Sequence, residues 1–219
     1  MSEAPEKYTL TKGQKFYSHV KRVLDFVLSL LAMIILSPLL AGIYIAIKCE
    51  DGWKKNAIFD QTRIGVDQKR FNLYKFRSMK TDAPHDLATH LLEHPEQYVT
   101  KVGKFLRKTS LDELPQLINI LKGEMSLCGP RPALWNQYDL IAERDKYGAN
   151  DVMPGLTGWA QVNGRDALEI EEKARYDGEY AQKLSFGLDL KIFVMTIINV
   201  LRHSDVVEGG TGTLKGADK

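Results

Sequence analysis

The hydropathy pattern is dominated by one apolar run near the N-terminus. Residues 23–47 read VLDFVLSLLAMIILSPLLAGIYIAI, and Asp25 is the single charge among them. A helix of this length can reach across a bilayer, and the run is too long for the apolar part of a cleaved signal peptide. The pattern predicts a membrane-bound chain, with residues 1–20 as a polar lead-in at the membrane surface. Arg22 and Asp25 have the spacing of an anchoring ion pair there.

Ser37 and Pro38 interrupt the middle of this run. Proline lacks a backbone N–H and clashes with the preceding helical turn, which favours a re-entrant helix-break-helix over residues 21–50. Basic residues flank both ends, and such flanks usually stay cytoplasmic; they are Lys12, Lys15, Lys21 and Arg22 before the run and Lys48, Lys54 and Lys55 after it. Prolines also occur in helices that cross the bilayer. The pattern by itself therefore leaves a crossing helix and a re-entrant one as alternatives.

Residues 51–207 have the mixed pattern of a cytoplasmic catalytic domain, and the Gly-rich residues 208–219 predict a flexible tail. The segments IFDQTRIG and RFNLYKFRSM are rich in β-branched and aromatic residues and flank a polar turn, which predicts a β-hairpin. Its second arm presents Lys75 and Arg77. These side chains either bind phosphate or form the solvated face of an edge strand.

Helical periodicity dominates the rest of this domain. Apolar residues recur behind the pair Asp112–Glu113 and predict a helix that begins at the pair. Its start is either a capping box at Ser110 or an N-cap at Asp112, which suits Pro115 in the first turn. Further helices are predicted over 134–147, 167–184 and 186–203, the last apolar enough for the membrane surface or for the core. The predicted fold class is α+β and mainly helical.

The acidic pair is the strongest candidate for chemistry. At a helix N-terminus the macrodipole favours an ionised carboxylate and also a phosphate oxygen, although acidic residues there often only cap the helix. Arg107 precedes the pair, and two loops with glycine and proline follow it. Pro130 and Pro132 restrict the backbone around Arg131, whose guanidinium suits a diphosphate or a carboxylate; a core acid is the alternative partner. The turn at 163–164 presents Arg165 in the same way.

The composition limits the classes of ligand and partner that the chain is expected to bind. The 219 residues include 30 basic and 28 acidic ones, a balance that does not favour nucleic acid as a partner. Two cysteines without CxxC spacing indicate neither a disulfide framework nor a zinc site, and the usual glycine-rich nucleotide motifs are absent from the sequence. His85, His90 and His94 lack the spacing of a metal-ligand set. A cytoplasm-facing site with local positive charge is expected.

Four segments in order carry a family resemblance: KRVLDFVLSLLAMIILSPLL, LYKFRSM, RKTSLDELPQLINILKGEMSLCGPRP and PGLTGWAQVNGR. With them the chain resembles the bacterial sugar transferase family of monotopic polyprenyl-phosphate phosphoglycosyl transferases. The resemblance covers nearly the whole chain. It implies a re-entrant helix broken at Ser37 and Pro38, so that the bacterial inner membrane is entered from the cytoplasmic face but not crossed.

The resemblance also implies residue roles. Asp112 corresponds to the nucleophile and to a contact of Mg²⁺, and Glu113 to a supporting acid, base or metal-ordering group. Phosphate and nucleotide binding is implied for a set of basic residues, namely Arg107, Arg131 and Arg165, together with Lys75 and Arg77. One departure is Asp166, where many relatives have Asn; it puts sugar and nucleotide contacts of that loop in doubt and leaves the nucleophile unaffected.

The implied reaction transfers a sugar 1-phosphate from a UDP-sugar to undecaprenyl phosphate and releases UMP. Carboxylate attack gives an acyl phosphate on Asp112, which divides the exchange into two steps at one site. The product would initiate glycoconjugate or exopolysaccharide assembly in the membrane. Two alternatives are a membrane-anchored glycosyl transferase that releases UDP, and a non-enzymatic scaffold whose basic loops bind anionic lipid headgroups. The motifs specify neither the sugar nor the oligomeric state.

Overall fold

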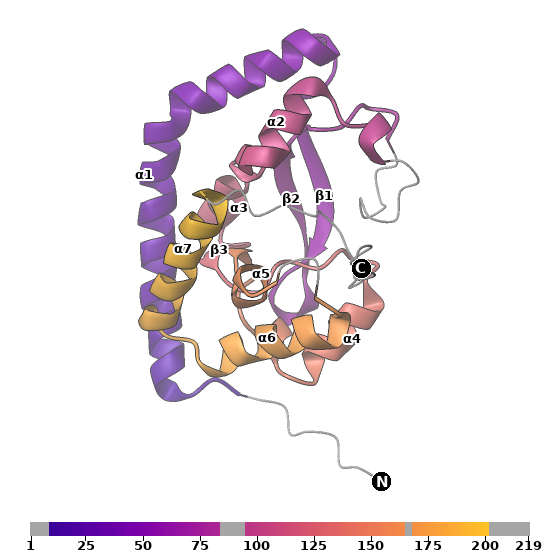
Figure 1. Ribbon diagram of the computed structural model, residues 1–219. Helices are drawn as coiled ribbons and strands as arrows, with labels where there is room; N and C mark the ends of the chain where they lie inside the picture. The colour runs from indigo at the N-terminus through magenta and orange to yellow at the C-terminus, as the bar shows by residue number, and fades with distance from the viewer. Residues whose placement is uncertain (1–8, 84–94, 165–167, 202–219) are drawn as a thin grey trace.

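A computed structural model describes residues 9–83, 95–164 and 168–201. A long helix, α1 (Lys12–Asp51), runs along one side of the molecule and bends over its top, and the other elements pack in the concave space that it leaves (Figure 1). In chain order these are β1 (Ile58–Ile64), β2 (Arg70–Phe76), α2 (Lys101–Thr109), α3 (Gln116–Lys122), β3 (Ser126–Cys128), α4 (Tyr138–Asp145), β4 (Gly155–Thr157), α5 (Trp159–Val162), α6 (Ile170–Gln182) and α7 (Phe186–Leu201). The fold is mainly helical with a small antiparallel sheet, as predicted.

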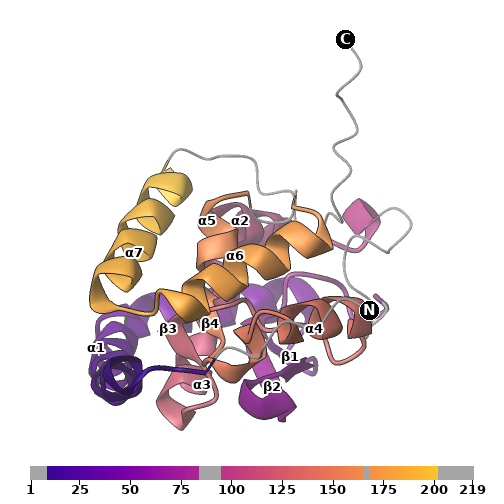
Figure 2. The same ribbon diagram turned by 90° about the horizontal axis from the view of Figure 1, so that it is seen from below.

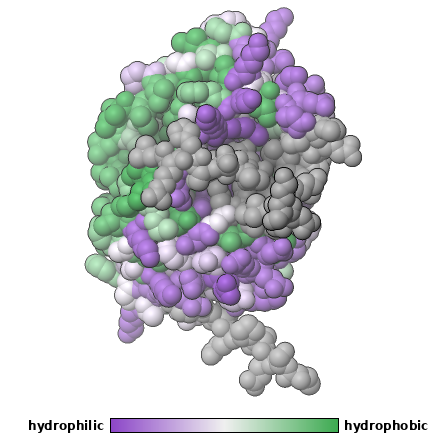
Figure 3. Space-filling view, in the orientation of Figure 1, coloured by the Kyte–Doolittle hydropathy of each residue, from purple (hydrophilic) through white to green (hydrophobic). Residues whose placement is uncertain are grey.

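The first half of α1 has an inverted pattern of polarity. Lys21, Asp25 and Ser29 lie one turn apart and are buried against the domain. The apolar residues of its other faces are exposed, among them Val23, Phe26, Leu28, Leu31, Ile34 and Ile35. Surface helices of soluble proteins have the opposite pattern. Figure 3 shows apolar residues gathered on the side where α1 and α7 lie. Within the described ranges, α1 is the one helix long and apolar enough to cross a membrane.

Ser37 and Pro38, where a break was predicted, lie within one continuous helix, and Figure 1 shows that this helix is bent. Pro38 has no N–H to donate to the carbonyl of Ile34, and the Ser37 hydroxyl donates to that oxygen instead, at 2.8 Å. This bond replaces the missing backbone one. The helix also begins at Lys12, inside the predicted lead-in, after a capping box at Thr11.

The predicted ion pair between Arg22 and Asp25 is wrong. Arg22 instead donates to the carbonyls of Ile120 and Leu121, the latter at 2.9 Å, where a cation satisfies the C-terminal end of α3. Asp25 accepts a hydrogen bond from the Ser126 hydroxyl at 2.7 Å and another from the Leu127 N–H at 3.2 Å. Each residue therefore anchors α1 to a different element of the domain.

A buried network of charges joins α1 to the C-terminal helices. The Lys21 ammonium lies 2.7 Å from the Asp189 carboxylate and 3.8 Å from Asp25. The hydroxyls of Tyr17 and Tyr180 also donate to Asp189, at 2.6 and 2.8 Å. Burial, with the negative charge of Asp189, raises the pKa of the Tyr180 phenol well above its usual value, so this donor stays protonated. One carboxylate on α7 thus holds α1 and α6.

The predicted hairpin is confirmed. β1 pairs antiparallel with β2, in a register that places Ile58 opposite Phe76 and Ile64 opposite Arg70. A short 3-10 helix, Val66–Gln68, makes the turn. Residues from three elements then form one core cluster: Ile43 and Ile47 of α1 pack with Phe76 of β2 and with Leu106 of α2. The hairpin is thereby fixed beneath the second half of α1.

A second, parallel sheet was not predicted. β3 pairs with β4, and this pairing joins the two loops that contain glycine and proline. A Cβ atom on Gly129 would lie 2.2 Å from the carbonyl oxygen of Met153, and one on Gly155 would lie 2.1 Å from the Gly129 nitrogen. The glycines are required by this close approach of two backbones. In Figure 2, α6 and α7 lie over β3 and β4, and α1 is seen nearly end-on beside them.

The three other predicted helices are present within their predicted ranges, as α4, α6 and α7. α4 begins later than expected because Leu134 forms a β-bridge with Arg63. Of α7, Ile192 is buried while Phe186, Phe193 and Ile197 are exposed, so the helix adds to the apolar face of α1. The three histidines of the insert and the predicted tail lie outside the described residues.

We expect Asp189→Asn to destabilise the fold by about 3–5 kcal/mol, because the buried Lys21 ammonium loses its nearest counter-charge. Denaturant unfolding in detergent, followed by circular dichroism, measures the change. The matched control breaks the exposed pair of Arg175 and Glu172 with Glu172→Gln, which should leave the unfolding midpoint unchanged. An Asp189→Asn protein as stable as the wild type would show that the buried pair does not hold the fold.

Candidate active site

The acidic pair lies in a turn between two helices. Asp112 and Glu113 belong to a 3-10 helix, Leu111–Glu113, and α3 begins only at Gln116. The predicted helix start at the pair is therefore wrong, and neither Ser110 nor Asp112 caps α3 with its side chain. The physical reason is that Ser110 ends α2 in the left-handed conformation, with φ 56°, and the chain must turn before α3. A non-glycine residue in this conformation stores backbone strain beside the pair.

Glu113 is the centre of the described charge cluster. Its carboxylate lies 3.0 Å from the Lys75 ammonium and 2.6 Å from the Arg131 guanidinium, which makes a second contact at 3.3 Å. Burial raises the pKa of this carboxyl, but the charges of Arg131 and Lys75 outweigh burial and hold the pKa well below its usual value. The structure thus brings three predicted site residues together from β2, the turn and the loop after β3.

Of the other predicted residues, Asp112 directly precedes Glu113 in the turn, and Arg77 follows the end of β2. Asp112 is buried, with 3% of its surface exposed. Arg107, in the last turn of α2, donates from Nε to the Ser78 hydroxyl at 2.9 Å, which places it just beyond the end of β2. Arg77 is half-buried, and its backbone N–H donates to the carbonyl of Ala57. Arg165 lies outside the described residues. Substrate binding by these arginines stays a prediction.

Asn119 supports the site and was missed from the sequence. Its carboxamide accepts from the Tyr74 N–H at 3.0 Å and donates to the Asn72 carbonyl at 2.7 Å. It also donates to Glu124 at 2.7 Å. Asn119 therefore pairs with the open edge of β2 as a strand would, which fixes the backbone beside Lys75. A buried asparagine within a helix was the available signal, since asparagine favours bonds to nearby backbone over helix formation.

Arg63 supports the segment next to Arg131, the second cation that contacts Glu113. It donates to the carbonyl of Pro132 at 3.0 Å, and the Ile64 N–H donates to the carbonyl of Ala133 at 3.0 Å. β1 thus holds the segment that directly follows Arg131. An arginine in a polar, alternating strand looks like a solvated residue, so the sequence contained no signal for this contact.

The side chains suit a magnesium ion that is shared with phosphate oxygens. Glu113 contacts Lys75 and Arg131 through its two oxygens, and Asp112 is the other carboxylate of the pair. No group of three or more His, Cys, Asp or Glu side chains among the described residues could hold a metal ion. Magnesium commonly binds through one or two carboxylates together with substrate phosphates. The residues therefore fit magnesium that arrives with a diphosphate.

The family model for the bacterial sugar transferases matches residues 16–203, and the chain belongs to this family. A relative from Escherichia coli (strain K12), named UDP-glucose:undecaprenyl-phosphate glucose-1-phosphate transferase, is 42% identical over 186 residues, which cover 81% of this chain and 39% of the relative. The undecaprenyl-phosphate galactose phosphotransferase of Salmonella typhimurium is 35% identical over 198 residues, 84% of this chain and 41% of that protein. The chain spans about two fifths of the length of these relatives.

A shorter relative is the uncharacterized sugar transferase EpsL of Bacillus subtilis (strain 168). It is 47% identical over 143 residues, which cover 65% of this chain and 69% of that protein. Membership of the family confirms the resemblance that the four motifs indicated.

The lowered pKa of Glu113 predicts how its contribution to stability changes with pH. A carboxylate whose pKa is lower in the folded protein contributes stability that is complete above its unfolded-state pKa, near 4.5, and is lost as the pH falls through the folded value. Glu113→Gln should therefore be less stable than the wild type at pH 7, and the difference should shrink below a pH of about 4.5. Denaturant titrations across this range measure it; a constant difference would contradict the ion pairs.

Proposed function

We propose that the chain is a phosphoglycosyl transferase that moves a sugar 1-phosphate from a UDP-sugar to undecaprenyl phosphate and releases UMP. The observation that carries the proposal is the arrangement of charges around the acidic pair. Glu113 is neutralised by Lys75 and Arg131, whereas Asp112 is the neighbouring carboxylate beside this positive charge. The names of the two longer relatives, which specify sugar phosphate transfer to undecaprenyl phosphate, support it.

Asp112 acts as the nucleophile in two balanced steps. A carboxylate oxygen of Asp112 forms a bond to the sugar-bearing phosphorus, and the bond from that phosphorus to the bridging oxygen breaks, so that UMP leaves with the electron pair. An oxygen of the lipid phosphate then attacks the same phosphorus. The acyl phosphate bond breaks, the Asp112 carboxylate is restored, and a lipid diphosphate-sugar is formed. This product would start assembly of a glycoconjugate or exopolysaccharide.

The cations make the approach of two anions possible. Lys75 and Arg131 carry two positive charges, which offset the two carboxylates of the acidic pair and so lessen the repulsion of an incoming phosphate. Arg107, Arg77 and Arg165 are proposed to add to it. Because its pKa is lowered, Glu113 stays ionised and orients Lys75 and Arg131, a role that suits it better than that of a general acid. Asp112 would hold Mg²⁺ jointly with the diphosphate, and bound Mg²⁺ would neutralise charge on the phosphate oxygens.

The same proposal includes a re-entrant α1 and a site at the cytoplasmic face of the bacterial inner membrane. A straight helix of 40 residues would be about 60 Å long, yet both ends of α1 contact one domain. Lys21 pairs with Asp189 near one end, and Ile47 packs on Phe76 near the other. The bend at Ser37 and Pro38 makes both contacts possible. An apolar helix whose two ends meet one water-facing domain enters the bilayer and returns to the same side.

Asp112→Asn should lower UMP release by about a thousandfold or more, because the nucleophile is lost. The assay combines a panel of UDP-sugars with undecaprenyl phosphate and Mg²⁺, and a labelled sugar phosphate reports the protein adduct, which should also disappear. Asp82→Asn, at an exposed position, is the matched control and should stay active.

Other outcomes of this assay identify the alternatives. A labelled adduct on the Asp112→Asn protein would show that another residue is the nucleophile. Release of UDP in place of UMP would identify a glycosyl transferase. Binding of anionic vesicles with neither product release nor any dependence on Mg²⁺ would indicate a scaffold.

Cysteine labelling tests the topology, because α1 already carries the exposed Cys49 near its C-terminal end. In intact cells, Cys49 and a cysteine introduced as Lys12→Cys should both resist a membrane-impermeant thiol reagent and should react after permeabilisation. Cys128 is buried, so a Cys49→Ser protein should not react in either case. If the cysteine at position 12 reacts in intact cells while Cys49 does not, α1 crosses the membrane.

A further inference from the structure

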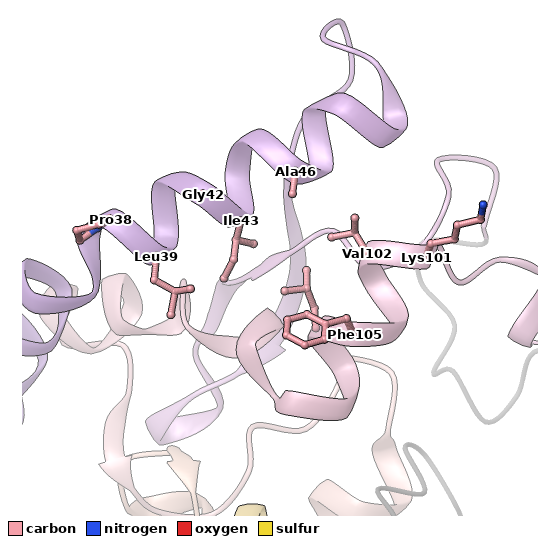
Figure 4. Close-up of a pocket in the computed structure, with 9 residues that line it drawn as sticks. Pro38, Leu39, Gly42, Ile43, Ala46, Lys101, Val102 and Phe105 are labelled. Atoms are coloured by element: carbon pink, nitrogen blue, oxygen red, sulfur yellow. The ribbon is translucent and has the colours of Figure 1, made fainter.

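An apolar groove lies between the second half of α1 and α2. Its volume is about 620 Å³, within the range of cavities that hold small molecules and cofactors. Its walls include Leu39, Gly42, Ile43 and Ala46 of α1 and Val102 and Phe105 of α2. Figure 4 shows Leu39 and Ile43 pointing toward α2, with Val102 and Phe105 on the facing side. Lys101, at the start of α2, is the charged residue of the lining.

Small residues keep this groove open. Gly42 and Ala46 lie one turn apart on the face of α1 that lines the groove, and no atom lies within 4 Å of a Cβ atom built on Gly42. A glycine inside a helix costs about 1 kcal/mol relative to alanine, so the open space exists at the expense of helix stability. On the opposite wall, 59% of the Phe105 surface is exposed although its ring is apolar. Such a surface fits an apolar ligand.

The groove adjoins the acidic turn through the core. Leu106, which lines the groove, belongs to the same core cluster as Leu111, the residue directly before Asp112. Arg107 follows Leu106 in the chain and contacts Ser78 at the end of β2. α2 therefore presents apolar side chains to the groove and positive charge beside it, with Lys101 at one end and Arg107 at the other. This matches a lipid that has an apolar chain and a phosphate head.

We propose that the groove binds the part of the isoprenoid chain of undecaprenyl phosphate nearest its phosphate, and so directs that phosphate to the adduct on Asp112. The inference rests on the proposed function and adds the place where the acceptor chain binds. The acceptor is favoured over a membrane phospholipid because the groove adjoins the nucleophile turn, where only the acceptor has to react. The groove would then act in the second step and not in the first.

Gly42→Leu tests the groove because the new side chain enters open space and leaves the helix backbone unstrained. The first step is measured as adduct formation from the UDP-sugar without lipid, and the second as transfer from the adduct to undecaprenyl phosphate. We expect the KM for undecaprenyl phosphate to rise about tenfold, which corresponds to about 1.4 kcal/mol, while the rate of adduct formation is unchanged. Equilibrium binding of undecaprenyl phosphate in nanodiscs should weaken by the same factor.

Gly13→Leu is the matched control. Gly13 lies in the same helix with equally open space around a Cβ atom, but outside the groove, so both steps should match the wild type. An acceptor whose chain is too short to fill the groove should react equally with the wild type and Gly42→Leu.

Three results would overturn the inference or separate it from the proposed function. An unchanged KM and unchanged binding of undecaprenyl phosphate in Gly42→Leu would show that the chain binds elsewhere and that the groove holds bulk phospholipid. Equal slowing of both steps would show that the groove only supports the fold. A wild type that forms no adduct would overturn the proposed function instead, and the binding measurement would still decide whether the groove holds the acceptor.

Discussion

The buried ion pair between Lys21 and Asp189 is the interaction on which the arrangement of this molecule depends. A charge removed from water is destabilising unless an opposite charge accompanies it. Burial of Lys21 on α1 and of Asp189 on α7 therefore favours the contact between these two helices, in which each charge has an opposite charge 2.7 Å away. Tyr17 and Tyr180 donate to the same carboxylate, which fixes the two helices in rotation as well as in distance.

From this pair a series of polar contacts and chain connections reaches the acidic turn. Asp25, one turn after Lys21, holds β3 through Ser126 and Leu127. β3 continues into the loop that presents Arg131, and Arg131 contacts Glu113. α1 and the acidic turn are thus connected by side chains of defined geometry. This arrangement keeps the turn at a fixed position relative to the apolar surface of α1, which the proposed reaction between a water-soluble donor and a lipid acceptor would require.

Local patterns in the sequence predicted the elements well. Two runs rich in β-branched and aromatic residues around a polar turn identified the hairpin, and the helices α4, α6 and α7 were also predicted. Partners distant in sequence could not be predicted in this way. Asp25 was expected to pair with Arg22, three residues away, yet it binds residues more than 100 positions later. The parallel pairing of β3 with β4 is equally non-local, since each strand has only three residues and no pattern of its own.

In the candidate site, too, some features could be predicted from the sequence and others depended on contacts between distant residues. The sequence and the family resemblance grouped Lys75, Glu113 and Arg131, and the structure brings them together. The sequence did not show that both cations share one carboxylate of the pair, because that depends on the 3-10 turn. If α3 had begun at the pair, both carboxylates would have lain in the first turn of the same helix, and the sequence would have given no reason to assign them different partners. Asn119 and Arg63, which hold the backbone beside the two cations, resemble ordinary polar residues until their partners are known.

The inverted polarity of α1 also has a consequence for the order in which the molecule is made. Tyr17 and Asp189 are 172 residues apart, and at ribosomal rates of about 5–20 residues per second they leave the ribosome roughly 10 to 30 seconds apart. During that interval the polar stripe of α1 has no partner from the C-terminal helices, while its apolar faces already favour lipid. The contacts that fix the rotation of α1 against the rest of the molecule are therefore completed late in biosynthesis, when α6 and α7 have been made.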